Sequence, residues 1–147
     1  MQAMILEGKY DFAASQRDLW DFLIDPARIA KCLPDLKSFE VEGEDKFVAI
    51  VRVGVGFIKS DFKFKAEIAG KEPIKRLTLK AAGSGSGSNI SLDMNIELRE
   101  ISGGTQLSYS SDVKVGGIIA SLAQRVIKDS AEKNLAGVFG CIKEQVG

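Results

Sequence analysis

The chain contains no histidine and only two cysteines among its 147 residues. Without histidine it lacks the usual base of Ser/His/Asp and Cys/His nucleophile pairs and the commonest zinc ligand, which removes much of hydrolase chemistry. Cys32 and Cys141 are far apart and form no CxxC motif, so the sequence predicts neither a disulfide scaffold nor a metal cluster. We expect two reduced thiols packed in the core, with no metal, no cofactor and no catalytic residue.

The chain also lacks a net charge and a long apolar run. Twenty basic and twenty acidic residues cancel, which leaves none of the positive excess typical of nucleic-acid binding. No apolar run approaches the roughly 18 residues needed to cross a bilayer, and residues 1–12 do not resemble a signal peptide. With 45% hydrophobic residues the chain is long enough for one core. We therefore expect one cytoplasmic domain over residues 1–147 that does not bind nucleic acid.

The N-terminal region predicts a strand followed by two short helices. Apolar residues alternate over residues 4–12, the period of a half-buried strand. Ser15 stands where a helix N-cap is expected, and the helix after it should end at Asp25, because a residue before proline avoids helical geometry. A second short helix is expected over residues 27–33, between two prolines.

Period-two alternation then continues from residue 39 to residue 115, interrupted by turn residues at hairpin spacing. Each of these strands has one polar face, which favours an antiparallel sheet. The Gly/Ser tract at residues 83–88 lacks the Gly-Lys-Ser/Thr ending of a phosphate loop and favours a tight turn or bulge. Strand residues without side chains there also leave space above the sheet, a hint of a ligand cavity.

The region after Gly116-Gly117 predicts one long helix over residues 118–146, with apolar residues at helical spacing. The predicted fold is α+β: a curved antiparallel sheet, two short helices after the first strand, and a C-terminal helix across the sheet. This is the helix-grip arrangement. We expect one buried cluster to join sheet and helix: Leu92, Met94, Ile96, Leu107, Leu122 and Val126.

Small residues occupy the sheet-facing side of the middle of this helix. A ligand cavity is as compatible with that pattern as a tightly packed helix. The candidate cavity residues on the helix are Ala123, Ser130, Ala131, Asn134, Gly137 and Val138. Tyr10 and Tyr109 occupy inward strand positions, where a phenol could orient a ligand carbonyl or bond to nearby backbone or water.

Three stretches carry a family resemblance: residues 53–59 (VGVGFIK), the tract at 82–87 (AGSGSG), and residues 104–125, with Gly116-Gly117 and Gln124-Arg125. In this order, around this strand pattern, the chain resembles the START/Bet v 1-like (SRPBCC) superfamily. Within it, the chain resembles the CoxG-like family, which is associated with carbon monoxide dehydrogenase. The resemblance covers nearly the whole chain.

The resemblance implies a non-enzymatic accessory protein with a hydrophobic cavity that holds a lipid- or quinone-like ligand. It further implies a role in maturation or membrane recruitment of a molybdenum-containing dehydrogenase. Some members carry a membrane-associating tail, whereas this sequence stops at Gly147 directly after the helix. We therefore expect peripheral contact with the inner face of a membrane to come from the folded surface or a partner. Two alternatives stay open: a cyclase- or hydrolase-like helix-grip enzyme, and a structural assembly factor with a vestigial cavity.

Charge is balanced overall but not locally. Acidic residues dominate residues 11–45 and basic residues dominate residues 59–80. Lys63 and Lys65 fall on the outward face of their strand, where they indicate either an ordinary solvated surface or a face for an acidic partner or anionic headgroups.

Overall fold

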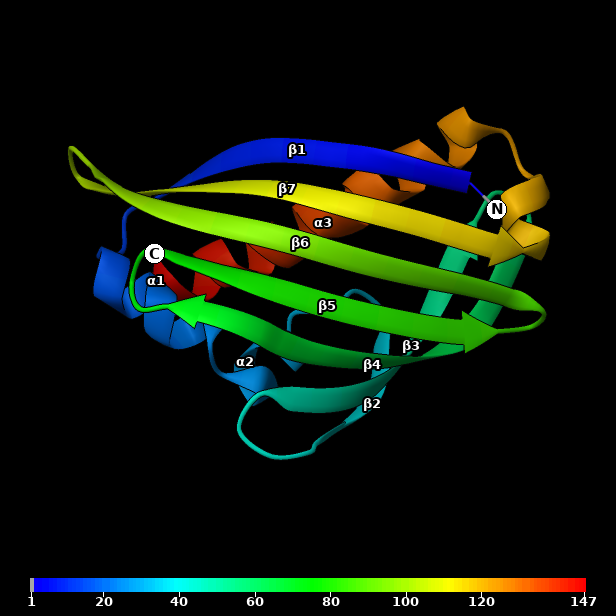
Figure 1. The fold of residues 1–147 in the computed structure, drawn as a ribbon, viewed down its shortest axis with the longest axis horizontal. Helices are drawn as coiled ribbons and strands as arrows, with labels where there is room; N and C mark the ends of the chain where they lie inside the picture. The colour runs from blue at the N-terminus through cyan, green and yellow to red at the C-terminus, as the bar shows by residue number, and fades with distance from the viewer. Residues whose placement is uncertain (1) are drawn as a thin grey trace.

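The computed structural model describes residues 2–147 (Figure 1). Its elements are β1 (Gln2–Phe12), α1 (Gln16–Leu23), α2 (Pro26–Ala30), β2 (Leu36–Val41), β3 (Lys46–Val55), β4 (Ile58–Glu72), β5 (Arg76–Gly85), β6 (Ser88–Ile101), β7 (Gly104–Gly117), the 3-10 turn η1 (Ile118–Ser121) and α3 (Gln124–Val146). The strands form one sheet in the order β1-β7-β6-β5-β4-β3-β2. All neighbours are antiparallel, and α3 crosses behind the sheet. The predicted helix-grip fold is confirmed.

The sequence alternation places one face of each strand in the core. Along β7, Leu107, Val113 and Val115 are buried, whereas Asp112 and Lys114 between them are exposed. Such alternation follows from the two-residue repeat of a strand, in which successive side chains point to opposite faces. The concave face therefore carries the apolar side chains, and α3 covers them.

The helices differ in length from the predictions. Helix α3 begins at Gln124 rather than at residue 118, and α2 ends at Ala30 rather than at residue 33. The segment before α3 is held by long-range contacts: Gln2 Nε2 donates to the carbonyl oxygens of Ala120 (2.8 Å) and Leu122 (2.7 Å). Periodicity along the chain does not register such contacts, which explains the six-residue error at α3.

The predicted cluster joining sheet and helix is only half confirmed. Met94, Ile96 and Leu107 are buried, whereas Leu92, Leu122 and Val126 are only partly buried. Leu92 lines a cavity, and the last two residues lie at one end of the molecule against the turn between β3 and β4. The core is therefore densest away from the start of α3.

The Gly/Ser tract is a packing feature of the sheet. A Cβ atom on Gly83 would overlap the Phe64 ring, and one on Gly85 would overlap the carbonyl oxygen of Asp61. Glycine is required where two elements approach this closely. The space above Gly83 is filled by a side chain of this protein, which corrects the expectation that the tract leaves room for a ligand.

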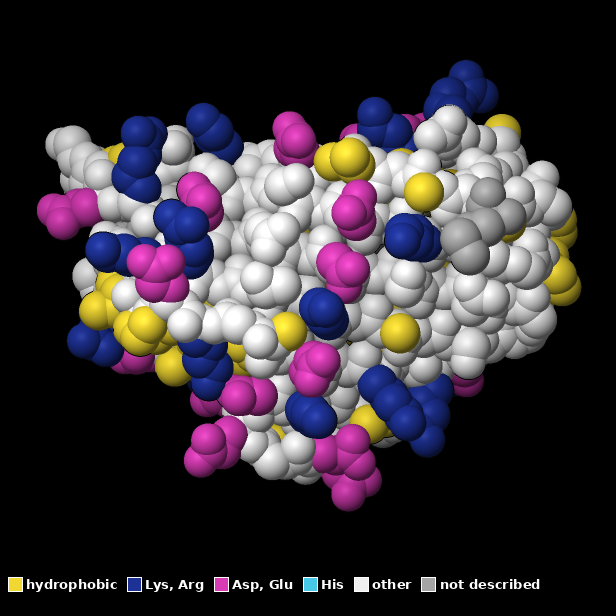
Figure 2. All heavy atoms as spheres, viewed as in Figure 1, with side chains coloured by type: hydrophobic (Ala, Val, Ile, Leu, Met, Phe, Trp, Pro, Cys, Tyr) yellow, Lys and Arg dark blue, Asp and Glu magenta, His cyan; other side chains and the backbone are white. Residues whose placement is uncertain are grey.

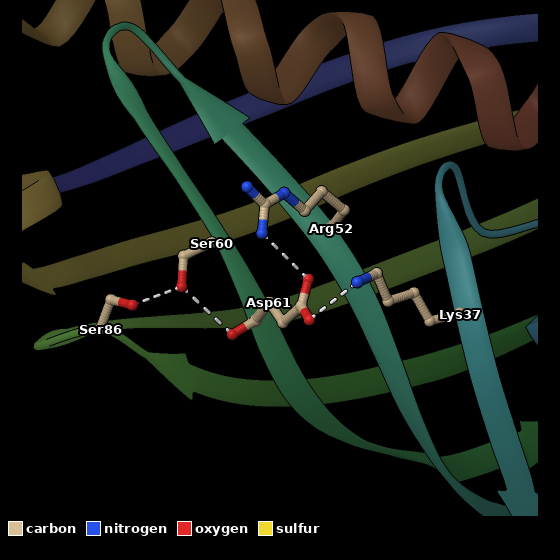
Figure 3. Close-up of polar contacts among 5 residues, drawn as sticks. All are labelled: Lys37, Arg52, Ser60, Asp61 and Ser86. Carbon is tan, nitrogen blue, oxygen red and sulfur yellow. Dashed lines mark hydrogen bonds and ion pairs between the residues drawn. The ribbon is translucent and has the colours of Figure 1, made fainter.

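The convex face of the sheet carries charges of both signs. Figure 2 shows basic and acidic side chains interspersed over this side. Asp61 accepts hydrogen bonds from Lys37 Nζ (3.0 Å) and Arg52 Nη1 (3.4 Å), as Figure 3 shows. Chiefly because of the Lys37 hydrogen bond, the pKa of Asp61 lies below its ordinary value. The local basic excess in the sequence is therefore offset by acids on neighbouring strands, the pattern of a solvated surface.

Candidate functional site: an apolar cavity beneath the long helix

A cavity of about 290 Å³ lies between the concave face of the sheet and α3. Its walls are mostly apolar and come from the strands, from α3 and from the region of α2. The sheet contributes Leu6, Phe47, Val51, Val53, Val55, Phe64, Ala66, Ile68, Leu79, Ala81, Ile90, Leu92, Met94, Ile96, Val113 and Val115. Such a lining favours binding of apolar molecules, since it offers area rather than hydrogen bonds.

The cavity reaches the surface between α3 and β3. Asn134 both lines the cavity and is exposed to solvent. On one side of it Ser130 Oγ donates to the carbonyl oxygen of Gly54 (3.0 Å). On the other side Gly137 lies beside Pro34, whose Cγ is 3.5 Å from the position of an added Cβ. These two contacts bound the opening along the helix.

The structure brings four of the eight predicted cavity residues to the cavity wall. They are Ser130, Ala131, Asn134 and Val138 on the middle of α3. Their spacing keeps them on one side of the helix. Because they are small or medium in size, α3 covers the sheet here without filling the space beneath it.

The other four predicted residues do not line the cavity, which corrects the prediction. Ala123 is the exposed N-cap residue just before α3, and Gly137 is exposed beside Pro34. Tyr10 and Tyr109 stack on Phe139, with ring centroids 4.6 Å and 5.1 Å from its ring. Because Phe139 lines the cavity, its ring stands between the cavity and the two phenols.

The two tyrosines instead border a polar groove between β1 and α3, lined also by Lys9, Asp129 and Glu132. Tyr109 lies over Gly8, where an added Cβ would be 2.7 Å from its ring. Burial raises the pKa of Tyr109, and Tyr10 and Glu132 add to that shift. This phenol is therefore held in its neutral form, away from the apolar cavity.

Cys32 and Cys141 form a disulfide, which corrects the prediction of two reduced thiols. Their Cα atoms are 5.5 Å apart although 109 positions separate them in the sequence. The bond joins the turn after α2 to α3, and both of these segments supply cavity walls. Disulfides are typical of oxidising compartments, so this bond weighs against the predicted cytoplasmic location.

Sequence reasoning also missed the cavity wall near α2. Pro26, Ile29, Leu33 and Pro34 line the cavity. The prolines mark helix boundaries in the sequence, but nothing local indicates what they pack against. Within residues 2–147 no helix is long and apolar enough to span a membrane. The same residues contain no group of three or more Cys, Asp or Glu side chains placed to hold a metal.

Solved structures of similar shape define the class. A START superfamily protein from Mycobacterium smegmatis has a TM-score of 0.72 at 12% identity, covering 97% of this chain and 96% of that one. The Zhui aromatase/cyclase from Streptomyces sp. R1128 has a TM-score of 0.71 at 14% identity, covering 99% and 94%. At these identities the likeness concerns the fold, and this protein has the START/Bet v 1-like helix-grip fold.

The family follows from the sequence. Residues 8–147 match the carbon monoxide dehydrogenase CoxG family, and the chain belongs to it. A conserved protein from Geobacillus kaustophilus is similar in structure, with a TM-score of 0.89 at 26% identity over 97% of this chain and 95% of that one. No curated protein sequence matches the chain. Family and fold together indicate a hydrophobic ligand-binding function.

Proposed function

We propose that the protein is a non-enzymatic carrier that binds a lipid- or quinone-like molecule beneath α3 and serves a molybdenum-containing, CO-dehydrogenase-type oxidoreductase. The observation that carries the proposal is the apolar cavity of about 290 Å³ under the helix. Burying about 300 Å² of apolar ligand surface would contribute about 7 kcal/mol before ordering costs. That is enough for reversible binding without any catalytic group.

The size of the cavity restricts its ligand. At about 30 Å³ per water, 290 Å³ corresponds to roughly ten water volumes. This is the lower end of the range for drug-sized ligands. The cavity holds a ring system or a short chain, and a long tail has to leave beside Asn134 or push the walls apart.

The charged residues near the cavity support binding rather than catalysis. Asp45 borders the cavity and forms an ion pair with Lys71. General acid–base chemistry needs a titratable group free to exchange a proton with a substrate. The titratable tyrosines lie behind Phe139, so an enzyme would have to work from the cavity rim. A cyclase-like enzyme and an empty assembly factor are the two alternatives that the experiments below separate from a carrier.

Peripheral membrane contact is part of the proposal, through one end of the molecule. Phe57, in the turn between β3 and β4, is 80% exposed, and Ile118 at the start of η1 is 51% exposed. Both lie at the end where Gly56 packs against Leu122 and Val126. An exposed aromatic side chain on a tight turn is suited to the headgroup region of a bilayer. Phe57→Ser should weaken sedimentation with vesicles of anionic lipid, and a wild-type protein that ignores vesicles would remove membrane contact from the proposal.

The carrier is tested by extraction and by filling the cavity. Native mass spectrometry and solvent extraction of the purified protein should reveal an apolar molecule. Ala131→Trp introduces bulk at the cavity wall and should weaken binding of a fluorescent fatty-acid probe at least tenfold while the protein stays folded. Ala136→Trp, at an exposed position of the same helix that does not line the cavity, is the matched control and should bind like wild type.

The outcomes separate the three functions. A folded wild-type protein that binds no probe and releases no extracted molecule would leave the assembly factor. Conversion of the bound molecule by the pure protein would establish an enzyme. Equal losses of probe binding in both tryptophan variants would show that the probe does not occupy the cavity.

A further inference from the structure

Ser111, in the middle of β7, has a hydroxyl group that is fully buried and has no hydrogen-bond partner. Other buried hydroxyls of the chain are satisfied: Thr105 Oγ1 donates to the carbonyl oxygen of Ala14 (2.9 Å), and Ser88 Oγ accepts from the amide of Ile119 (3.1 Å). Nearly all buried polar groups in native proteins have a partner, so an unpaired hydroxyl calls for a physical reason.

The position of Ser111 supplies that reason. Val113 and Val115 follow it at two-residue spacing, so Ser111 shares their concave face, and both valines line the cavity. The residues in register with it on the neighbouring strands, Leu6 and Met94, line the cavity as well. The hydroxyl therefore lies within the sheet floor of the cavity, one layer of side chains below its surface.

What covers Ser111 can move. Met94 is unbranched and flexible, and such a side chain adapts to irregular space at small energetic cost. A rotamer change of Met94 would open a path from the cavity to the hydroxyl without any change in the backbone. Tyr109, two residues earlier, is turned over Gly8 and stacked behind Phe139, so it does not compete for this position.

We propose that Ser111 is the polar recognition group of the cavity and donates a hydrogen bond to a carbonyl or ether oxygen on an otherwise apolar ligand. This inference rests on the carrier function proposed above and specifies the chemistry of its ligand. A serine hydroxyl has one hydrogen to donate. A ligand oxygen that only accepts satisfies it and brings no further donor into a cavity that is mostly apolar.

The test compares two probes of nearly equal shape, 2-acetylnaphthalene and 2-ethylnaphthalene, which differ in one carbonyl group. Titration calorimetry of the full chain should give about fivefold tighter binding of the ketone, the fold-change expected for one net hydrogen bond. Ser111→Ala should abolish that preference and leave the affinity for the hydrocarbon unchanged. Ser88→Ala makes the same chemical change at a hydroxyl whose partner is a backbone amide, and it should retain the preference.

A second measurement guards against a folding defect. The thermal unfolding of Ser111→Ala without ligand should match or exceed that of wild type, because the change removes a buried hydroxyl that has no partner. Equal affinities for the two probes in wild type, or a preference that survives Ser111→Ala, would overturn the role of Ser111 and leave the carrier intact. A wild-type protein that binds neither probe would overturn the carrier and the role of Ser111 together.

Discussion

Removal of the Cys32–Cys141 disulfide should cost much of the stability of the protein. The bond closes a loop of 109 positions, because it ties the turn after α2 to the C-terminal part of α3. In the chain-entropy description a loop of this length restricts the unfolded state by about 4.8 kcal/mol at 25 °C. Measured losses for native disulfides are typically about 2–5 kcal/mol. We expect the variant with Cys32→Ser and Cys141→Ser to lose that much free energy of unfolding.

Urea unfolding followed by the fluorescence of Trp20 measures this loss. Trp20 is the one tryptophan of the chain and is buried in α1, so its emission reports the loss of the core. With a urea dependence of about 2 kcal/mol per molar, a loss of about 4.8 kcal/mol lowers the midpoint by about 2.4 M. Wild type treated with a reductant should approach the serine variant, whereas the same reductant should leave that variant unchanged.

The reasoning fails if the bond does not form or does not constrain the unfolded chain. Two free thiols in unfolded, unreduced wild type would refute the disulfide itself. A midpoint change below about 0.5 M, equal to about 1 kcal/mol at the same urea dependence, would refute the predicted magnitude.

Three further predictions concern packing and pH. Leu107→Ala, at a fully buried site, should cost about 2–5 kcal/mol in urea unfolding, and Leu122→Ala, partly buried, clearly less; equal losses would contradict the burial pattern. Gly85→Ala should lower the unfolding free energy by about 1–3 kcal/mol because its Cβ would meet a β4 carbonyl oxygen, whereas Gly140→Ala, in open space on α3, should raise it by about 1 kcal/mol. Because burial raises the pKa of Tyr109, the unfolded chain releases that proton first and stability should fall as the pH rises above about 10. Tyr109→Phe should weaken this fall, and an unchanged pH profile would contradict it.

The comparison of sequence and structure is instructive at the tyrosines. Alternation correctly places Tyr10 and Tyr109 on the inward face, but it does not say which of the two sides of α3 they occupy. Phe139 decides that, because its ring stacks on both phenols and separates them from the cavity. The same alternation along β7 passes through Ser111, the inward hydroxyl that sequence reasoning overlooked.

The sequence by itself determines the strand order along the chain, the antiparallel sheet and the long C-terminal helix. These features follow from the two-residue period of strands and the 3.6-residue period of helices, which local apolar spacing records. Four of the eight predicted cavity residues were found in the same way, from one face of α3. Only the tertiary structure decides the disulfide, the start of α3 and the cavity wall near α2. Each depends on contacts between residues far apart in sequence, such as Cys32 with Cys141 and Gln2 with Leu122, and no local period encodes such pairs.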